Sequence, residues 1–398
     1  MKNFVFISPN FPTSYWKFCA ELKNNGLRVL GIGDCPYDEL TQDLRESLHE
    51  YYKVSNLENF DEVFKAVAFF TYKYGKIDWL ESNNEYWLER DARLRTEFNI
   101  TSGFKSHQID YIKRKSAMKN YYAKAGIPTA RYHLVHGYED AAEFAHLVGY
   151  PVVVKPDNGV GASQTYRLNS DDELHFFIDH MDDQIYIMEE FVNGYVRTYD
   201  AIIDSQGNSI FEAGNVTPLS IMDVVNDQCE SIYYIVKELP EAVKDVGQRT
   251  VKAFGVRSRF VHLEYFVLNA DQEGLGKKGD IIGLEVNMRP AGGFTPDMYN
   301  FAYETDVYKI WADMIAFDKS TVDQNKPRHN CAFIGRRDGK RYKLDDEAVR
   351  YKYGPGMMMS GRIPDALSGA MANQMYVANF DTEEEMMAYY EDLAARYE

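Results

Sequence analysis

The segment Leu284–Pro296, LEVNMRPAGGFTP, places three polar side chains at alternating positions at the end of a short apolar strand. Glu285, Asn287 and Arg289 would project from one face, because successive side chains of a strand point to opposite faces. A carboxylate and an amide oxygen suit Mg²⁺, and a guanidinium can grip phosphate or carboxylate oxygens. The Pro-Ala-Gly-Gly turn that follows would let backbone approach a bound molecule. The segment therefore predicts a metal and anion site.

A second strand could add a ligand to the same site. The run RFVHLEYFVL carries Glu264 and could pair antiparallel with the segment IIGLEV. Glu264 would then lie beside Glu285 and Asn287 and complete a cluster of oxygen ligands. The alternative is a carboxylate facing solvent on an amphipathic strand, although its apolar neighbours favour burial against a partner. His262 is expected on the opposite face of this strand, in a structural role.

A glycine-containing loop indicates anion binding further upstream. The apolar run Val152–Val154 delivers Lys155 into the loop Asp157–Ser163, DNGVGAS. Such a loop can turn backbone N–H groups towards phosphate oxygens, with the lysine as a point charge. It is not a Walker A motif, because the Gly-Lys-Ser/Thr ending is absent, and a Gly-x-Gly alone is a weak signal. The helix expected over 112–125 carries Lys113, Arg114, Lys115 and Lys119, and the plain structural interpretation of these residues is a solvated basic face.

The amino-acid composition limits the kinds of molecule that the protein is expected to bind. Lys and Arg number 44 and Asp and Glu number 61, which gives a net charge of −17. This charge argues against a general surface for nucleic acid or anionic membranes. The four cysteines lie far apart without metal-binding spacing, and reduced cysteines in the cytoplasm are the default. No apolar run is long enough for a signal peptide or a membrane span, so we expect a cytoplasmic location.

Strands and helices alternate in the N-terminal region. Residues 1–105 follow a βαβαβα pattern, which predicts a small parallel sheet with helices on both faces. Ligands of such sheets bind beyond the carboxyl ends of the strands, where the loops Ser8–Pro12 and Glu81–Glu85 lie. Ordinary turns are an equally weighted alternative for both loops. The absence of a GxGxxG fingerprint disfavours a dinucleotide-binding domain.

Taken together, these motifs resemble the ATP-grasp superfamily, specifically its carboxylate–amine ligases of the amino-acid and peptide type. Lys115 lies eleven residues before Gly126, as the first nucleotide-binding lysine of this family does. YPVVVKP resembles the strand that presents the second lysine, and IMEEFVNG resembles the hinge strand at the adenine. HLEYF and LEVNMRP resemble the paired strands that carry the metal ligands. The match covers roughly residues 105–300 and rests on the order of five loose motifs.

The resemblance implies a multidomain fold of the α/β and α+β classes. A doubly wound parallel βαβ domain (1–105) would precede an ATP-grasp fold, whose two α+β subdomains clasp ATP. The small lid-bearing subdomain would span 106–190, and the large subdomain with the metal site would span 191–320. A small α+β extension (321–398) would follow, with its basic turn Arg336–Arg341 as a solvated hairpin tip and Met357–Met359 in its core.

The resemblance also implies site residues. ATP would be bound by Lys115, Lys155, Gly159, Gly161, Ser163, Glu189, Glu190, Phe191 and Val192. Glu264, Glu285 and Asn287 would hold one or two Mg²⁺ ions, which Mn²⁺ could replace. Lys155 and Arg289 would serve the transferring phosphoryl group. Arg289, Gly292, Gly293 and Phe294 would line the carboxylate pocket.

The implied reaction activates a small-molecule carboxylate as an acyl phosphate, couples it to an amine and releases ADP and phosphate. A homodimer is the prior expectation. One position departs from the family: Val196 stands where an acid usually binds the ribose. Ribose binding would then fall to Asp200 or Thr198, or be weaker. A carboxylase-type ligase with another acceptor and a non-catalytic nucleotide-binding module are the alternatives. A nicotinamide-dependent oxidoreductase is disfavoured, because its glycine fingerprint is absent.

Overall fold

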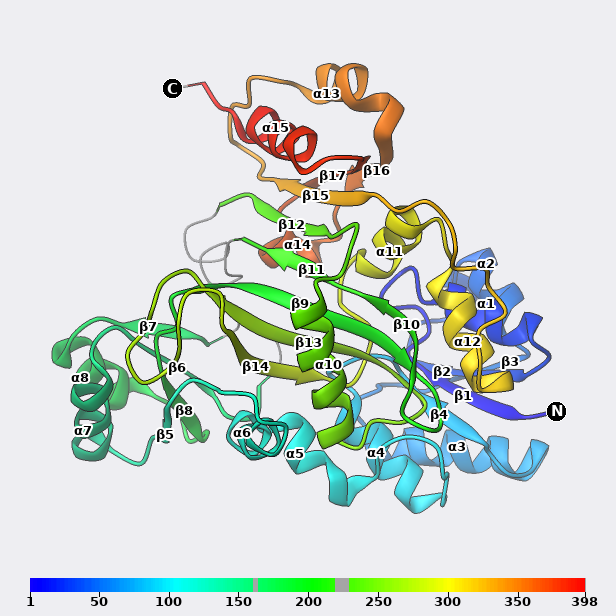
Figure 1. Ribbon diagram of the computed structural model, residues 1–398. Helices are drawn as coiled ribbons and strands as arrows, with labels where there is room; N and C mark the ends of the chain where they lie inside the picture. Colours follow the sequence, from blue (N-terminus) through cyan, green and yellow to red (C-terminus); the bar gives the residue numbers. More distant parts are fainter. Residues whose placement is uncertain (160–163, 219–228, 398) are drawn as a thin grey trace.

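The described residues of the computed structural model form three β-sheets, and Figure 1 shows how the sheets are arranged. The structure describes residues 1–159, 164–218 and 229–397. A parallel sheet forms the N-terminal part, a small antiparallel sheet follows, and a long antiparallel sheet links the centre of the molecule to the C-terminal part. The predicted mixture of parallel α/β and antiparallel α+β architecture is confirmed. None of the helices in the described ranges is long and apolar enough to cross a membrane.

The N-terminal sheet is fully parallel, with strand order β3-β2-β1-β4. Its strands are β1 (Asn3–Ile7), β2 (Arg28–Gly33), β3 (Glu50–Lys53) and β4 (Trp79–Glu81), and its helices are α1 (Trp16–Asn24), α2 (Gln42–Ser47), α3 (Phe60–Tyr74) and α4 (Leu88–Glu97). The sequence did not predict β3, because the run Glu-Tyr-Tyr-Lys lacks the apolar pattern of a buried strand. The predicted βαβ domain is otherwise present.

Both faces of this sheet are buried. Val5 and Ile7 pack with α3 on one face, whereas Phe4 and Phe6 point into a larger core on the other. That core includes Trp311 of α12 (Val307–Phe317), far along the chain. The N-terminal sheet is thereby fixed against the rest of the molecule, and the carboxyl ends of β1 and β4 are held in place.

The small antiparallel sheet has the strand order β5-β8-β6-β7. It consists of β5 (Tyr132–Leu134), β6 (Val152–Pro156), β7 (Tyr166–Leu168) and β8 (Tyr186–Glu190), with α7 (Tyr138–Val148) and α8 (Asp171–His180) packed on it. In Figure 1 this unit lies to one side of the long sheet. Ser170 caps α8 by accepting a hydrogen bond from the Glu173 amide.

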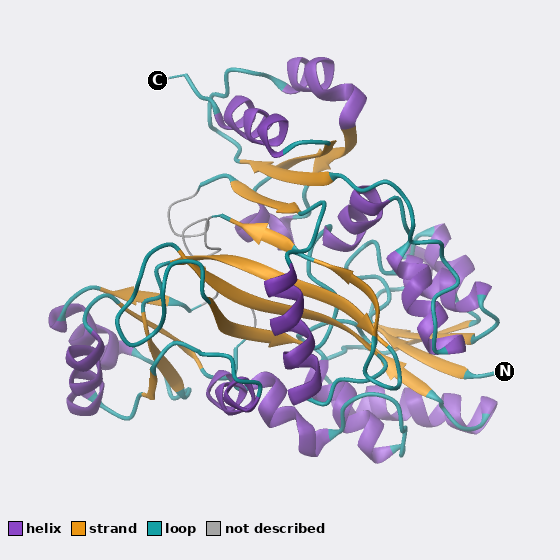
Figure 2. Ribbon diagram, in the orientation of Figure 1, coloured by secondary structure: helices purple, strands orange, loops and turns teal. Residues whose placement is uncertain are grey.

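The long sheet runs in the order β14-β13-β9-β11-β12-β15-β17-β16, with β10 paired to β9. Its first part comprises β9 (Gly194–Ile203), β10 (Ser209–Ala213), β11 (Asn215–Thr217), β12 (Ser231–Ile235), β13 (Arg259–Leu268) and β14 (Ile281–Asn287). Figure 2 shows α10 (Glu241–Ala253) crossing one face of these strands. Gly247 makes this close approach possible, because a Cβ there would overlap the ring of Tyr199 on β9.

Two further groups of helices frame the centre of the long sheet. They are α5 (Ile109–Lys113) and α6 (Lys115–Lys124) below it, and α11 (Thr295–Tyr303) beside α12. Tyr122 of α6 packs directly on Gly283 of β14, where a Cβ would lie 2.7 Å from the ring. The single helix predicted over 112–125 is wrong, since Arg114 has extended backbone angles and separates α5 from α6.

The C-terminal strands continue the long sheet. They are β15 (Asn330–Arg336), β16 (Met357–Arg362) and β17 (Gln374–Phe380), accompanied by α13 (Asp346–Tyr353), α14 (Asp365–Met371) and α15 (Glu383–Ala394). The predicted solvated turn is wrong at Arg336 and Arg337, because both side chains are buried. Arg336 donates to the Leu393 carbonyl, and Arg337 to the Ser368 carbonyl, so these two residues tie helices to the sheet. The predicted domain boundaries themselves stay a prediction.

Candidate functional site

Strands β13 and β14 bring the predicted metal ligands together. They pair antiparallel with Glu264 opposite Glu285 and His262 opposite Asn287. Asn287 Nδ2 donates to Glu264 Oε1 at 3.3 Å, and Arg289 Nη2 donates to Asn287 Oδ1 at the same distance. The sequence predicted this cluster, because period-two spacing and one antiparallel pairing are enough to define it.

His262 lies on the same face as Glu264, which corrects the sequence prediction. Residues two apart on a strand share a face, so the expected opposite orientation was wrong. His262 Nε2 lies 3.0 Å from Glu264 Oε1, and Nδ1 lies 2.6 Å from Asp200 Oδ1. Burial lowers the pKa of His262, but the two carboxylates outweigh burial and raise it to about 9.

Three lysines, two from α6 and one from β6, bring positive charge to the carboxylates of the site. Lys115 Nζ lies 3.3 Å from Glu285 Oε1, so the first predicted nucleotide lysine meets the predicted metal ligands. Lys155 and Lys119 both pair with Glu189, at 2.7 Å and 2.5 Å between their charged atoms. All three lysine side chains are buried, and Lys113 is buried as well. The predicted solvated basic face is therefore wrong, because the break at Arg114 turns α6 towards β14.

Sequence reasoning missed Lys119 as a site residue. Lys115 and Lys119 are four residues apart and lie on one face of α6, so a site role for the first already indicated the second. Burial lowers the pKa of Lys119 in spite of Glu189, whereas the pKa of Lys155 is raised because Glu189 and the two strand carboxylates outweigh its burial. Burial raises the pKa of Glu189, but the two lysines outweigh burial and lower it to about 2.

The predicted hinge residues do not all face the same way. Glu189 faces the lysines, whereas Glu190 binds Arg131 through two hydrogen bonds to its guanidinium, at 3.0 Å and 2.7 Å. The Phe191 carbonyl accepts a hydrogen bond from Gln272 Nε2 at 2.9 Å, and the Val192 side chain is buried in a small apolar cluster. Only Glu189 of the predicted hinge acids therefore joins the lysines, because neighbouring strand residues point to opposite faces.

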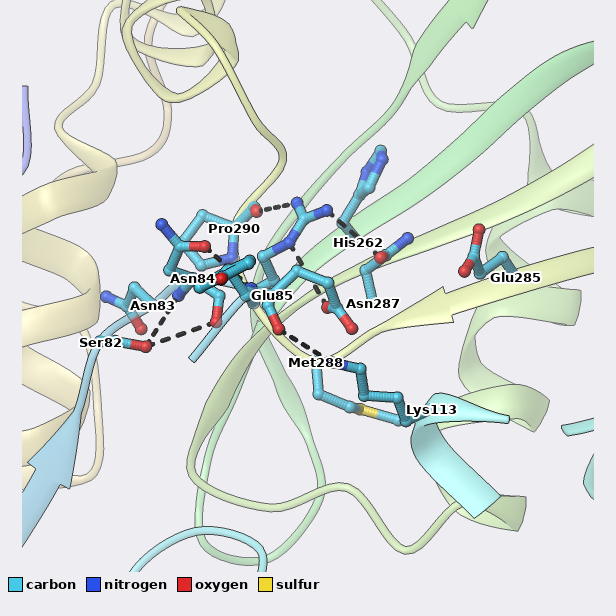
Figure 3. A network of polar contacts seen from close by, with 12 residues as sticks. Ser82, Asn83, Asn84, Glu85, Lys113, His262, Glu285, Asn287, Met288 and Pro290 are labelled. Atoms are coloured by element: carbon cyan, nitrogen blue, oxygen red, sulfur yellow. Dashed lines mark hydrogen bonds and ion pairs between the residues drawn. The ribbon is translucent and has the colours of Figure 1, made fainter. Parts of the chain in front are cut away.

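The N-terminal sheet contributes the loop after β4. Figure 3 shows Glu85, Asn287 and His262 gathered at the end of β14, with Glu285 further along that strand. Glu85 Oε2 lies 3.6 Å from Arg289 Nε, and Lys113 Nζ donates to the Glu85 carbonyl at 3.4 Å. Burial raises the pKa of Glu85 although Arg289 and Lys113 oppose this. The sequence indicated this loop as a ligand loop but did not single out Glu85.

Several buried polar atoms near this loop have no hydrogen-bond partner among the described residues. They are Glu85 Oε2, Asn83 Nδ2 and Asn10 Oδ1. Asn10 and Asn83 lie in the two loops at the carboxyl edge of the N-terminal sheet, where the sequence predicted ligand binding. Buried donors and acceptors normally find partners, so these atoms indicate a place for a polar ligand.

The glycine turn after β14 lies next to Arg289. Arg289 Nη1 donates to the Pro290 carbonyl at 2.7 Å, which holds the guanidinium against the turn. Gly293 has a φ of 61°, a conformation that favours glycine. Met371 of α14 packs on the same residue, and the Phe294 side chain packs partly into the main core. The turn therefore lies beside Arg289, where the sequence predicted the carboxylate pocket. That Gly292, Gly293 and Phe294 line this pocket stays a prediction.

The predicted lid loop is only partly described. The Gly159 carbonyl accepts a hydrogen bond from Lys115 Nζ at 3.4 Å. Gly161 and Ser163 lie outside the described residues. Of the suggested ribose ligands, Thr198 and Asp200 are both buried, and Asp200 is bonded to Thr198 and His262, so their role at the ribose stays a prediction.

The donor set fits a magnesium ion bound together with a polyphosphate. Within residues 1–159, 164–218 and 229–397, no group of three or more His, Cys, Asp and Glu side chains is placed to hold a metal. The strand tip instead offers two carboxylates and one amide. Mg²⁺ is commonly held by one or two carboxylates, with phosphate oxygens and water completing its octahedral shell. Glu264, Glu285 and Asn287 suit that mode of binding.

A scan against protein-family models finds no match for the sequence. A crystal structure of an L-amino acid ligase from Bacillus licheniformis superposes with a TM-score of 0.72 at 16% identity and covers 99% of this chain and 97% of that one. The biotin carboxylase domain of a Hydrogenobacter thermophilus 2-oxoglutarate carboxylase, crystallised as a dimer with MgADP and bicarbonate, superposes with a TM-score of 0.71 at 15% identity over 98% of this chain and 89% of that one. The chain has the ATP-grasp fold.

The predicted ATP-grasp fold is thus confirmed. Among curated proteins, the L-arginine-specific L-amino acid ligase of Bacillus subtilis is 31% identical over 122 residues. The matched stretch is 30% of this chain and 27% of that ligase. The matches span less than two thirds of the length of each of the curated relatives found. In the ATP-grasp fold of this chain, Lys155 and Glu189 come from the small sheet, whereas Glu264 and Glu285 come from the long sheet.

Proposed function

We propose that this ATP-grasp protein is an ATP-dependent ligase that joins a carboxylate to an amine and releases ADP and phosphate. The observation that carries the proposal is the contact between Lys115 and Glu285, at 3.3 Å. It brings the predicted phosphate-binding and metal-binding groups into one place. The L-amino acid ligases among the similar proteins support the same reaction class.

The charged side chains suit a triphosphate. A phosphoryl group in transfer spreads negative charge over its oxygens, so the protein must supply fixed positive charge close to them. Lys115 and Lys155 would neutralise the α- and β-phosphates, and Arg289 would stabilise the transferring phosphoryl. Mg²⁺, held by Glu264, Glu285 and Asn287, would add its own positive charge at the phosphates when bound. Whether one or two ions bind, and whether Mn²⁺ serves, belongs to the same proposal.

The substrate side carries both a cation and an anion. Arg289 would bind a carboxylate bidentately, and the buried carboxylate of Glu85 lies 3.6 Å from it. An amino acid presents a carboxylate and an ammonium group close together, so this pair suits an amino acid or small peptide. The three buried polar atoms without partners in the neighbouring loops would gain partners from such a substrate.

The chain's own residues would act by binding and orientation. A free carboxylate is a poor electrophile, because its charge repels nucleophiles and its oxygen leaves badly. Conversion to an acyl phosphate removes both obstacles, after which the amine attacks the carbonyl carbon and phosphate leaves. Arg289 would hold the carboxylate in line with the phosphoryl group, and the buried lysines would keep the charge balanced in a site that excludes water.

A direct test measures ADP and phosphate release from ATP with pooled amino acids. Wild-type protein should form both products, and Lys155→Ala and Glu285→Ala should abolish turnover while the fold, followed by circular dichroism, is kept. Lys124→Ala, on the exposed side of α6, is the matched control and should be active. Wild-type-like turnover in either site variant would contradict the proposal. Turnover with bicarbonate alone would favour a carboxylase-type ligase, and ATP binding without turnover would favour a regulatory module.

Three other expectations remain predictions. They are a homodimer, a cytoplasmic location and the absence of nucleic-acid and membrane partners. The dimeric biotin carboxylase domain among the similar structures supports the first. Size-exclusion chromatography with light scattering would measure the oligomeric state.

A further inference from the structure

A row of polar side chains crosses three strands of the long sheet, on the face opposite α10. Asp200 of β9 stands opposite His262 of β13, and His262 stands opposite Asn287 of β14. Thr198 of β9 stands in the same way opposite Glu264. The row joins a fully buried carboxylate to a proposed metal ligand through one imidazole ring.

The hydrogen bonds along this row converge on Asp200, which accepts from both sides, while His262 contacts a carboxylate at each ring nitrogen. The amide of Asn215 donates to Thr198 Oγ1 at 2.9 Å, and the Thr198 hydroxyl donates to Asp200 Oδ2. The other oxygen of Asp200 holds His262 Nδ1, and His262 Nε2 reaches Glu264 Oε1. Each donor has an acceptor, so the ring can neither rotate nor exchange partners without leaving a buried charge uncompensated.

The row fixes one oxygen of Glu264 and leaves the other available. Among the described residues, His262 Nε2 and Asn287 Nδ2 both reach Oε1 of Glu264, from either side. Glu264 is only partly buried, with 23% of its side chain exposed. Oε2 is therefore the oxygen that a cation bound at the strand tip would meet, and its direction is set by the two contacts to Oε1.

We propose that Asp200 and His262 are positioning residues, which hold Glu264 in the orientation that binds the metal ion. The proposal rests on the proposed function, since it assumes that Glu264 is a ligand. Neither residue would touch the metal or the substrates. Partners that orient a metal ligand typically contribute about 10- to 100-fold to metal affinity or activity. A histidine with a purely structural role would stabilise the fold without this effect on the metal.

The test measures Mn²⁺ binding directly, by electron paramagnetic resonance titration of the free ion in the presence of ADP. Asp200→Asn and His262→Gln should each raise the dissociation constant for Mn²⁺ by about 10- to 100-fold. The dissociation constant for ADP alone, without metal, should stay within about twofold of wild type. Excess metal should restore much of the lost turnover, which distinguishes a positioning role from a catalytic one.

His329 offers a matched control. It also stands between two carboxylates, with Nδ1 at 2.9 Å from Asp381 and Nε2 at 3.5 Å from Glu304, but it lies outside the candidate site. His329→Gln should leave Mn²⁺ binding unchanged. If Asp200→Asn does not fold, Thr198→Val removes the hydroxyl that donates to Asp200 and should raise the same constant by a smaller factor.

The outcomes separate this inference from the proposed function. In one outcome, the wild-type protein binds Mn²⁺ with ADP, and the variants bind Mn²⁺ equally well but melt at a lower temperature. This result would overturn the positioning role alone. Wild-type protein that shows neither ADP-dependent Mn²⁺ binding nor turnover would overturn the proposed function and the positioning role together.

Discussion

Lys155 Nζ lies 2.7 Å from Glu189 Oε2, and Lys119 holds the other oxygen of the same carboxylate. All three side chains are buried at the junction of the small sheet and α6. One carboxylate is thus shared by two cations, so these three groups carry an excess of one positive charge when all are ionised. A phosphate group that binds Lys155 must share this lysine with Glu189, and the excess positive charge suits an anionic ligand.

The first prediction concerns Glu189 and acid stability. Its pKa is lowered from 4.5 to about 2, so the ionised carboxylate stabilises the fold above pH 4.5, and this stabilisation is lost as the pH falls through 2. A pKa difference of this size between the folded and unfolded states corresponds to roughly 3 kcal/mol of folding free energy. Glu189→Gln should therefore lower the free energy of unfolding most at neutral pH, with a gap to wild type that narrows below pH 4.5. Urea unfolding between pH 2.5 and 7 measures this.

Asp172→Asn, on the exposed first turn of α8, serves as the control. Its free energy of unfolding should follow that of the wild type over the whole pH range. A gap between Glu189→Gln and wild type that is the same at every pH would show that the loss comes from packing and not from the charge.

The strand-tip site was largely predictable from the sequence, whereas its surroundings were not. Glu264, Glu285 and Asn287 follow from period two and a single antiparallel pairing, both of which are local properties. The burial of Lys119 and of Glu85 depends on the break at Arg114 and on how the N-terminal sheet meets β14. These are tertiary contacts between distant segments, and residue patterns within one segment do not specify them.

Two other predictions are wrong, each for its own reason. Arg336 and Arg337 were read as a solvated turn because charged residues usually face water, but α15 and α14 cover them and offer backbone carbonyls. The predicted orientation of His262 is wrong as well. Residues two apart on a strand share a face, so the sequence itself places His262 beside Glu264.

The second prediction concerns the buried ion pairs of Glu81. Its Oε2 lies 2.5 Å from Arg259 Nη2 and 3.3 Å from Arg95 Nη1, and both arginines are buried. Glu81→Gln would leave two buried guanidinium groups without their counter-charge, so the free energy of unfolding should fall by about 3–5 kcal/mol. Chemical denaturation measures the loss. Asp245→Asn removes the exposed pair with Arg249 on α10 and should cost less than about 1 kcal/mol; equal effects of the two variants would contradict the prediction.

The third prediction concerns the contact between Gly247 and Tyr199. A side chain at Gly247 would overlap the tyrosine ring and push α10 away from the long sheet. Gly247→Ala should therefore destabilise the protein by about 1–3 kcal/mol, and Gly247→Val by more. Thermal unfolding measures both. Gly369→Ala in α14 meets no atom within 4 Å and should be neutral or stabilising; a Gly247→Ala protein as stable as Gly369→Ala would show that α10 packs differently.

The fourth prediction concerns Glu85 and the proposed amino-acid substrate. A carboxylate that binds the substrate ammonium contributes a charge-assisted hydrogen bond of about 1.5–3 kcal/mol. Glu85→Gln should therefore raise KM for the ammonium-bearing substrate by roughly 10- to 100-fold, while KM for ATP stays near wild type. Steady-state kinetics with each substrate varied in turn measures both constants, and Glu97→Gln at the exposed end of α4 is the control.

Stability provides a second measurement for the same variant. Burial raises the pKa of Glu85, which means that its ionised form opposes folding at neutral pH. Glu85→Gln should therefore melt at or above the wild-type temperature while it loses substrate affinity, since a binding residue often lowers stability. A variant that melts lower and keeps its KM would instead assign Glu85 to the structural support of Arg289.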